Sequence, residues 1–406
     1  MKAKIIAIAI FALTAATVIY YPTVRGNPTH GVTPPGLHVL PPVTQHITVP
    51  VVVPKIEVVF VLDTTGSMSG LIQAAKDKIW SIASTMVSAQ PAPEISMGLV
   101  AYRDRGDAYV TKIVDLSTDL DSVYAALIDF TAAGGGDGPE SVNQALTDAI
   151  REISWSQDGD SYQVVFLVGD APPHMDYQDD VKYPVILAEA AKRGIIVNTI
   201  RCGNDAQTEA AWRSIAAITQ GAYFSVEQSG SAIAMETPYD AELAKLSADL
   251  DGTRLYYGND EERAEKQLKI AATNKLNAKA SDAAKARRAT FNASPSGATN
   301  LFGDRDLVAA VINGEVKLDE IETEKLPEPL QALTPEERDD VIRTNNELRL
   351  ELKRQIEKLS DQRASYLAAE VEASDDKEGS LDYRIFETVR DQAGKKGLEY
   401  PAAPKY

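Results

Sequence analysis

Residues 58–69 (VVFVLDTTGSMS) place three oxygen-bearing side chains directly after a run of five apolar residues. Asp63 follows the run, and Thr65 and Ser67 come at every second position after it. A short continuous apolar run is typical of a parallel strand that is buried on both faces. Carboxylate and hydroxyl oxygens are hard ligands of the kind that magnesium and calcium bind. The stretch therefore predicts a divalent-cation site on the loop at the carboxyl end of a central strand.

A second buried strand also ends in an acid. Residues 162–168 form another apolar run, and Asp170 follows it. In open α/β sheets, ligands bind at the carboxyl ends of strands, where the strand order reverses. If the two strands are neighbours, Asp63 and Asp170 lie within reach of one ion. The loop of residues 134–140 (GGGDGPE) opens another helix, so its amides and carboxylates are candidates to close a third side.

Strand and helix patterns alternate along residues 55–250, and this alternation predicts an α/β fold with a doubly wound sheet. The expected strands are residues 58–62, 95–102, 109–114, 162–168, 195–201 and 222–226. Helices are expected between them, and a closing helix is expected over residues 229–250.

Three motifs together resemble those of a bacterial von Willebrand factor type A domain: Asp63-x-Thr65-Gly66-Ser67, the loop of residues 134–140, and residues 168–174 (VGDAPPH). The resemblance covers residues 55–250. It implies a Rossmann-like, doubly wound, mostly parallel six-stranded sheet with one antiparallel edge strand. It also implies a metal-ion-dependent adhesion site, in which Mg²⁺ is bound by an Asp-x-Ser-x-Ser loop, a threonine in a second loop and an aspartate in a third.

The resemblance assigns metal ligands to individual residues. Asp63, Thr65 and Ser67 match the first loop, with threonine in place of its middle serine, and Asp170 matches the third loop. The second loop has no threonine at the corresponding place, and Asp137 is the expected substitute. The alternative role of Asp137 is to cap the helix that follows. Mg²⁺ is the expected cofactor, with Ca²⁺ or Mn²⁺ as alternatives.

The ligand types suggest a function. Neutral hydroxyls bind a cation without cancelling its charge, so the ion is expected to take a carboxylate from a partner protein. The expected function is therefore adhesion or protein–protein interaction through a Mg²⁺-bridged acidic residue, without enzyme activity. One alternative is an assembly or chaperone subunit of a larger bacterial complex. Another is a hydrolase with Ser67 as nucleophile and His174 as base, although no residue is evident to orient that histidine.

The N-terminal residues predict export. Lys2 and Lys4 precede an uncharged apolar run, and residues 1–21 are expected to be a signal peptide or an N-terminal membrane anchor. Residues 22–54 contain eight prolines, which is typical of an extended linker. We therefore expect an extracytoplasmic location, in the periplasm or on the cell surface.

Residues 251–406 are expected to be mainly α-helical. Residues 251–325 form a helical region, with one long helix over residues 260–290, and residues 326–406 form an acidic, coiled-coil-like tail. The sequence does not decide whether this tail forms a coiled coil with a partner or packs within the chain. It also does not decide whether the chain forms oligomers through this tail. Its heptad seam is expected at Val341, Asn345, Leu348, Leu352, Gln355, Leu359, Gln362, Tyr366 and Ala369. The net charge of −18 argues against nucleic acid as a partner.

Overall fold

The computed structural model describes residues 53–401 apart from residues 71, 137, 227–234 and 374–380. These residues belong to one compact unit, Val52–Tyr406. The expected signal peptide or anchor, nearly all of the proline-rich linker and Asp137 lie outside the described residues. Among the helices that are described, none combines the length and the apolar character that crossing a membrane requires.

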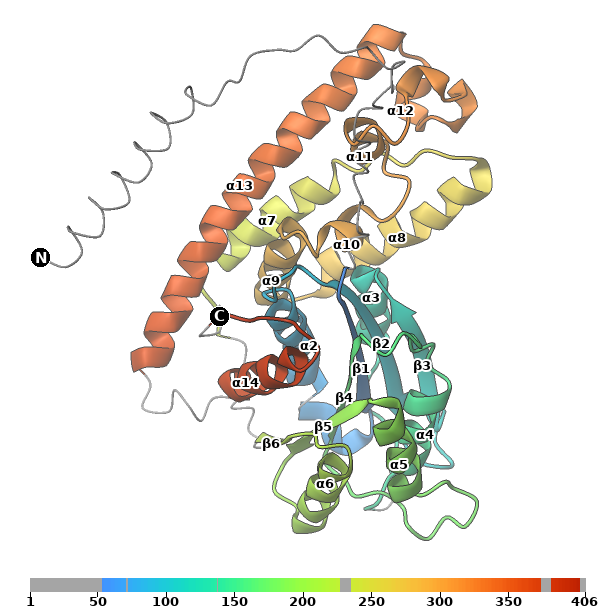
Figure 1. Cartoon of the computed structure of the whole chain (residues 1–406), viewed down its shortest axis with the longest axis vertical. Helices are drawn as coiled ribbons and strands as arrows, with labels where there is room; N and C mark the ends of the chain where they lie inside the picture. Colours follow the sequence, from blue (N-terminus) through green and yellow to red (C-terminus); the bar gives the residue numbers. More distant parts are fainter. Residues whose placement is uncertain (1–52, 71, 137, 227–234, 374–380, 402–406) are drawn as a thin grey trace, which may run out of the picture. The chain divides into compact units, whose positions relative to one another are not determined.

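The described residues form a six-stranded sheet in the order β3-β2-β1-β4-β5-β6 (Figure 1). Strand β3 lies at one edge and runs antiparallel to β2, and the other pairs are parallel. The expected doubly wound α/β fold with one antiparallel edge strand is confirmed. The strands are β1 (Lys55–Asp63), β2 (Glu94–Tyr102), β3 (Thr111–Ser117), β4 (Tyr162–Gly169), β5 (Ile196–Cys202) and β6 (Tyr223–Val226).

Strands β1 and β4 are neighbours at the centre of the sheet, and Leu62 pairs with Val168 in the parallel register. Every residue of β4, and every residue of β1 after Lys55, is buried. This explains their continuous apolar runs, since both faces of a central parallel strand are covered. The register brings Asp63 and the residues after β4 to the same edge of the sheet.

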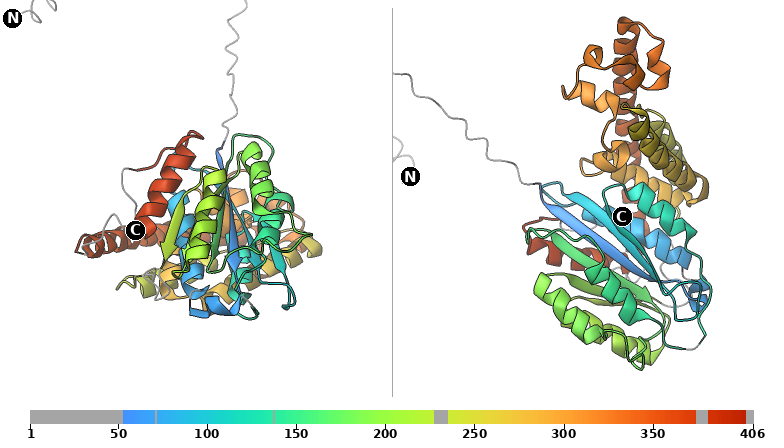
Figure 2. Two further views of the ribbon diagram at one scale, coloured as in Figure 1. Left: turned by 90° about the horizontal axis from the view of Figure 1, so that it is seen from below. Right: turned by 90° about the vertical axis from the view of Figure 1, so that its right-hand side faces the viewer.

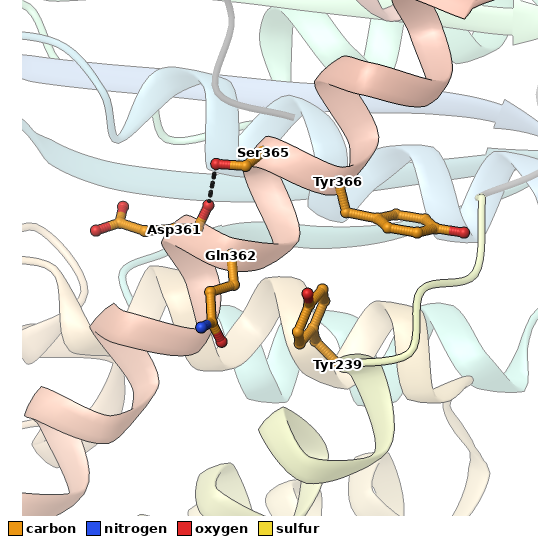
Figure 3. Close-up of a pocket in the computed structure, with 5 residues that line it drawn as sticks. All are labelled: Tyr239, Asp361, Gln362, Ser365 and Tyr366. Carbon is orange, nitrogen blue, oxygen red and sulfur yellow. Dashed lines mark hydrogen bonds between the residues drawn. The ribbon is translucent and has the colours of Figure 1, made fainter.

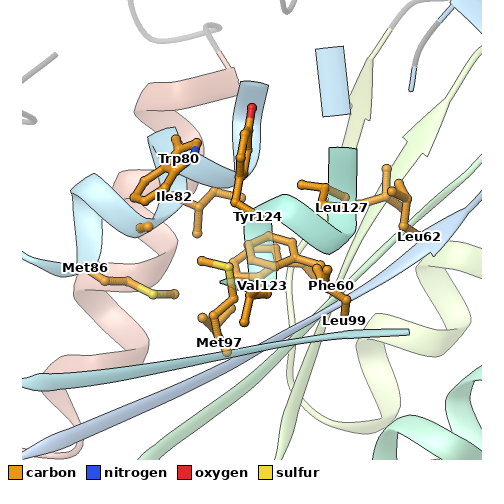
Figure 4. Close-up of a cluster of buried hydrophobic side chains, with 14 of the residues drawn as sticks. Phe60, Leu62, Trp80, Ile82, Met86, Met97, Leu99, Val123, Tyr124 and Leu127 are labelled. Atoms are coloured by element: carbon orange, nitrogen blue, oxygen red, sulfur yellow. The ribbon is translucent and has the colours of Figure 1, made fainter. Parts of the chain in front are cut away.

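Alternate residues of β1 face two separate cores. Phe60 packs on one side with helices α2 (Ile72–Met86) and α3 (Leu120–Asp129), as Figure 4 shows. Val61 packs on the other side with α4 (Val142–Arg151), α5 (Tyr183–Arg193) and α6 (Ala206–Ile218). The sheet is therefore a middle layer between helices, which holds the loops at its carboxyl edge in place.

A helix from the other end of the chain completes the first of these cores. Helix α14 (Leu381–Gly394) packs beside α2 and β6 (Figure 1), and Ile385, Val389 and Ala393 are buried with strand residues such as Phe224. The amide of Gln392 lies in the same interface. The domain limits expected from the sequence stay predictions, but the sheet face next to β6 is covered by residues far outside 55–250.

Most of the remaining helices lie in the expected C-terminal helical region (Figure 2). The remaining helices are α7 (Asp240–Asp251), α8 (Asp260–Lys279), α9 (Asp282–Ala293), α10 (Ala298–Phe302), α11 (Leu307–Ile312), α12 (Glu328–Gln331) and α13 (Pro335–Ala373). Short 3₁₀ turns, η3 (Leu318–Glu320) and η4 (Thr323–Lys325), precede α12.

Two expected helices were wrong in extent. The single helix over residues 260–290 is broken at Ala280, whose backbone is extended, and the Ser281 hydroxyl then caps a new helix by accepting from the Ala284 amide. The closing helix expected over residues 229–250 begins only at Asp240, because residues 235–237 have no regular structure and residues 238–239 form a turn.

The heptad seam expected for α13 was also wrong. Its buried residues are Ile342, Arg349, Leu352, Ile356, Arg363 and Leu367, so of the expected positions only Leu352 is among them. Two of these are arginines whose charges are compensated inside the chain. Arg349 pairs with Asp306 at 2.7 Å, and Arg363 pairs with Asp240 at 2.7 Å. Helix α13 thus packs on α7, α9 and α11 of its own chain. Of the two alternatives for the tail, this is packing within the chain.

Candidate metal centre

The first loop begins where β1 ends. Asp63 is fully buried, and its Oδ1 accepts hydrogen bonds from the Thr65 amide at 2.8 Å and the Thr65 hydroxyl at 2.6 Å. Its Oδ2 has no hydrogen-bond partner among the described residues. The 3₁₀ turn η2 (Gly66–Gly70) follows and carries Ser67 to the surface. The loop therefore runs from a buried carboxylate to an exposed hydroxyl.

Four oxygen-bearing side chains form a continuous series at this edge. The Thr65 hydroxyl lies 2.6 Å from Asp63 Oδ1 and 3.2 Å from the Ser67 hydroxyl, which donates to Asp170 Oδ1 at 2.9 Å. Adjacent ligands of an octahedral Mg²⁺ are about 2.9 Å apart, since each metal–oxygen distance is about 2.0–2.1 Å. The structure brings together four of the five expected ligands with spacings suited to one small ion.

The second loop is hydrogen-bonded to the first. The Gly66 amide donates to the Gly134 carbonyl at 3.0 Å, and the Ala133 amide donates to the Thr64 carbonyl at 3.0 Å. Gly134 has a φ of +78°, and a side chain there would overlap the carboxylate of Asp107. Glycine is therefore required at position 134 beside Asp107. A Cβ atom at Gly66 would lie 2.9 Å from the Gly134 carbonyl oxygen, so the first loop also needs glycine where it meets the second.

Asp137, the expected second-loop ligand, lies outside the described residues, but Glu140 of the same loop faces the site. Glu140 is 3% exposed, and its Oε2 has no hydrogen-bond partner in the described part of the chain. Its amide donates to the Pro172 carbonyl, and its carbonyl accepts from the His174 amide, so the second and third loops are joined. The sequence shows two acids in this loop, and their spacing alone does not show which of them points inward.

Crowded carboxylates make the site unusual electrostatically. Burial raises the pKa of Asp63 to about 7, and the charge of Asp170 adds to this. Burial, followed by the charges of Asp63 and Asp104, raises the pKa of Glu140 to about 9, and burial also raises the pKa of Asp170. A divalent cation would favour the ionised form of each.

The donor set fits a magnesium-type ion. Within the described residues, no three carboxylate or imidazole groups form a metal cage by themselves, so the hydroxyls of Thr65 and Ser67 would be needed as ligands. An unpartnered buried carboxylate oxygen, two hydroxyls and a second carboxylate are all hard oxygen donors. Asp63, Thr65, Ser67 and Asp170 are therefore suited to hold such an ion, with Glu140 beside them.

The alternative of a hydrolase with Ser67 as nucleophile and His174 as base has less support from the geometry. The Ser67 hydroxyl donates to Asp170, whereas the His174 ring stacks on Tyr177 and lies 2.8 Å from Asp176. A nucleophile–base contact between Ser67 and His174 is thus absent from the described hydrogen bonds. A hollow of about 410 Å³ elsewhere is lined by Tyr239, Asp361, Gln362, Ser365 and Tyr366 (Figure 3), and it contains none of the candidate metal ligands.

Comparison with known proteins finds matches to part of the chain. A family model described as von Willebrand factor A domain matches residues 57–237. The rat von Willebrand factor A domain-containing protein 7 is 34% identical over 122 residues, which are 30% of this chain. The aligned region is only 12% of that relative's length.

Solved structures with similar folds include the conserved hypothetical protein BatB from Bacteroides thetaiotaomicron, which is 17% identical with a TM-score of 0.34 and is matched over 44% of this chain and 93% of its own. The SpRpn10 VWA domain is 14% identical with a TM-score of 0.35, and the match covers 44% of this chain and 92% of that domain's chain. Proximal thread matrix protein 1 of the mussel byssus, with a zinc-occupied MIDAS motif, is 16% identical with a TM-score of 0.35. The match covers 44% of this chain and 43% of that protein's chain.

Residues 57–237 of the chain thus match a von Willebrand factor A domain. Domains of this class are in general modules for protein–protein interaction or adhesion. A mainly helical region follows the matched residues.

Proposed function

We propose that the chain is an exported binding protein that holds a partner through a Mg²⁺ ion, which is bridged to an acidic residue of that partner. Asp63, Thr65, Ser67 and Asp170 would bind the ion, and Glu140 or Asp137 would supply the second-loop contact. The observation that carries the proposal is the connected series of oxygens that runs from the buried Asp63 through Thr65 and Ser67 to Asp170.

The balance of neutral and charged ligands supports a binding role. Thr65 and Ser67 contribute hydroxyls, so part of the charge of the ion stays uncompensated on the exposed side, where Ser67 lies. Mg²⁺ commonly keeps exchangeable waters, and a partner carboxylate can replace one of them. The bound ion would supply the charge that attracts this carboxylate, while the residues of the chain fix its position.

The first test is a calorimetric Mg²⁺ titration of the full chain. We expect saturable binding by the wild type and its loss in Asp63→Ala, because Asp63 is the buried anchor of the site. Asp158→Ala is the matched control, since Asp158 precedes the amino end of β4 and lies in a turn with Ser161. No binding by the wild type, or equal binding by Asp63→Ala, would contradict the proposal.

The partner is tested with the same variants. Proteins retained by the wild type and by Asp158→Ala should be released by EDTA and should not bind Asp63→Ala. Retention that is insensitive to both changes would show that the partner binds elsewhere on the chain.

A further inference from the structure

Three buried oxygens at the carboxyl edge of the sheet lack hydrogen-bond partners among the described residues: Asp63 Oδ2, Tyr102 Oη and Glu140 Oε2. The proposed cation site accounts for Asp63 and Glu140, which are carboxylates. Tyr102 is not part of the motifs described above. Leaving a buried hydroxyl without a partner costs about 1–3 kcal/mol, so a tyrosine here is unfavourable unless its hydroxyl has another use.

The position of Tyr102 links it to Asp63. Tyr102 ends β2 and pairs in register with Asp63 on β1. Residues paired in this way point to the same face of the sheet, and the Tyr102 ring is buried there with Val61 and Leu146. Its hydroxyl therefore approaches Asp63 from inside the protein, opposite the exposed Ser67.

Gly169 provides the space in which these groups meet. It ends β4, on the far side of β1 from Tyr102. A Cβ atom built on Gly169 would overlap the Tyr102 hydroxyl and lie 3.1 Å from Asp63 Oδ2. The Tyr102 hydroxyl and the free oxygen of Asp63 thus border the same space, which exists because residue 169 has no side chain.

The hydroxyl is able to donate. A carboxylate oxygen is an acceptor only, and the phenol is the complementary donor.

We propose that Tyr102 is a positioning residue of the cation site, whose hydroxyl donates to Asp63 Oδ2 and fixes the ionised carboxylate beside the ion. The two groups are not hydrogen-bonded in this structure, and we expect the bond to form when the cation is bound. The inference rests on the proposed cation site and extends it to β2 and to Gly169. Partners that orient metal ligands in this way typically change metal affinity 10–100-fold when they are removed.

The test uses the full chain, with Mg²⁺ titrations by calorimetry and thermal unfolding in EDTA and in saturating Mg²⁺. Tyr102→Phe should weaken Mg²⁺ binding about 10–100-fold. In EDTA its Tm should be equal to or above that of the wild type, because the hydroxyl that is removed has no partner. A purely structural tyrosine would lower the Tm in both conditions and leave the affinity unchanged.

Tyr162→Phe is the matched control. The Tyr162 hydroxyl is also fully buried under the sheet, but it donates to Gln392 Oε1 at 2.7 Å. Its removal should lower the Tm in EDTA and leave the Mg²⁺ affinity unchanged. Tyr102→Phe should therefore weaken Mg²⁺ binding without lowering the Tm in EDTA, whereas Tyr162→Phe should lower the Tm in EDTA without changing the Mg²⁺ affinity.

A double-mutant cycle tests the contact itself. Gly169→Ala should weaken Mg²⁺ binding by displacing the Tyr102 hydroxyl, and it should have a smaller effect in the Tyr102→Phe background, where that hydroxyl is missing. Tyr102→Phe with wild-type affinity would overturn the inference about Tyr102 alone, provided that the wild type binds Mg²⁺ and Asp63→Ala does not. Absence of binding by the wild type would overturn both this inference and the proposed function.

Discussion

Asp121, in the first turn of α3, is fully buried and bound by an arginine from a distant helix. Arg288 of α9 donates through Nε to Asp121 Oδ1 at 2.6 Å and through Nη1 to Asp251 Oδ2 at 2.9 Å. Burial by itself would raise the pKa of Asp121, but the charge and hydrogen bonds of Arg288 outweigh burial and hold it well below its usual range. This pair joins the sheet domain to the helical region.

The pair predicts a loss of stability in acid. The pKa of Asp121 is lower in the folded chain than its value of 3.8 in the unfolded chain, so its contribution is complete above that value and is lost as the pH falls below it. In Arg288→Met, Asp121 is buried without its main counter-charge, and we expect about 3–5 kcal/mol less stability at pH 7.

Urea unfolding between pH 7 and pH 3 measures both effects. Acidification should reduce the difference in free energy of unfolding between the wild type and Arg288→Met, because protonation removes the uncompensated charge from the variant. A difference that does not change with pH would contradict this account of Asp121.

The candidate metal ligands differ in how far the sequence could predict them. Asp63, Thr65 and Ser67 are adjacent in the chain, and Asp170 could be placed with them because both acids follow buried strands. Glu140 could not be distinguished from its neighbour Asp137, because left-handed glycines such as Gly134 and Gly135 set the path of the loop. The place of Tyr102 beside Asp63 could not be predicted either, since it depends on the register between β2 and β1.

At the scale of elements, α14 is attached to the sheet by a polar contact inside an apolar interface. Gln392 accepts from the Tyr162 hydroxyl at 2.7 Å and exchanges hydrogen bonds with the Asn198 amide. These residues are buried. A polar network of this kind favours one position of the helix, because any shift leaves buried groups without partners.

Removal of the Gln392 side chain should therefore be costly. Gln392→Ala leaves the Tyr162 hydroxyl and the Asn198 amide without this partner, and we expect a loss of about 2–4 kcal/mol in the free energy of unfolding. Ser81→Ala is the control, because it removes a half-buried hydrogen bond from α2 to Asp382 next to the same helix. Urea unfolding that gives equal losses for the two variants would show that the Gln392 contacts do not hold α14.

In helix α13, the start of the helix was easier to predict than its buried face. Its start at Thr334-Pro335 follows from local capping chemistry, and the helix begins at Pro335. Its buried face includes Arg349 and Arg363, which a pattern based on apolar residues places in solvent. Their partners Asp306 and Asp240 lie 43 and 123 residues away in the chain, so no local signal identifies the pairs.

At the scale of the whole molecule, the chain has a net charge of −18, and three of its buried arginines are paired with aspartates inside the chain. Among the described residues, Arg288, Arg349 and Arg363 each pair with a buried aspartate. Large negative charge disfavours nucleic acid and favours solubility. It is also compatible with export of the chain, which the sequence of residues 1–21 predicts.

Export is tested with a reporter that is active only outside the cytoplasm, fused after Tyr406. We expect activity from the full chain and none after deletion of residues 2–21, because the two lysines and the apolar run would direct translocation. A reporter that is inactive in the full chain, or equally active after the deletion, would contradict an extracytoplasmic location. Size comparison of the fusion before and after membrane extraction separates a cleaved signal from a retained anchor.

The place of α14 in the chain has a consequence during translation. All six strands have been made by Val226, but 154 residues separate this point from Leu381, where α14 begins. At about 5–20 residues per second, the ribosome needs about 8–30 s to make that stretch. For this time the strands that have been made lack the helix that covers Phe224 and its neighbours, so this apolar surface has no cover from α14.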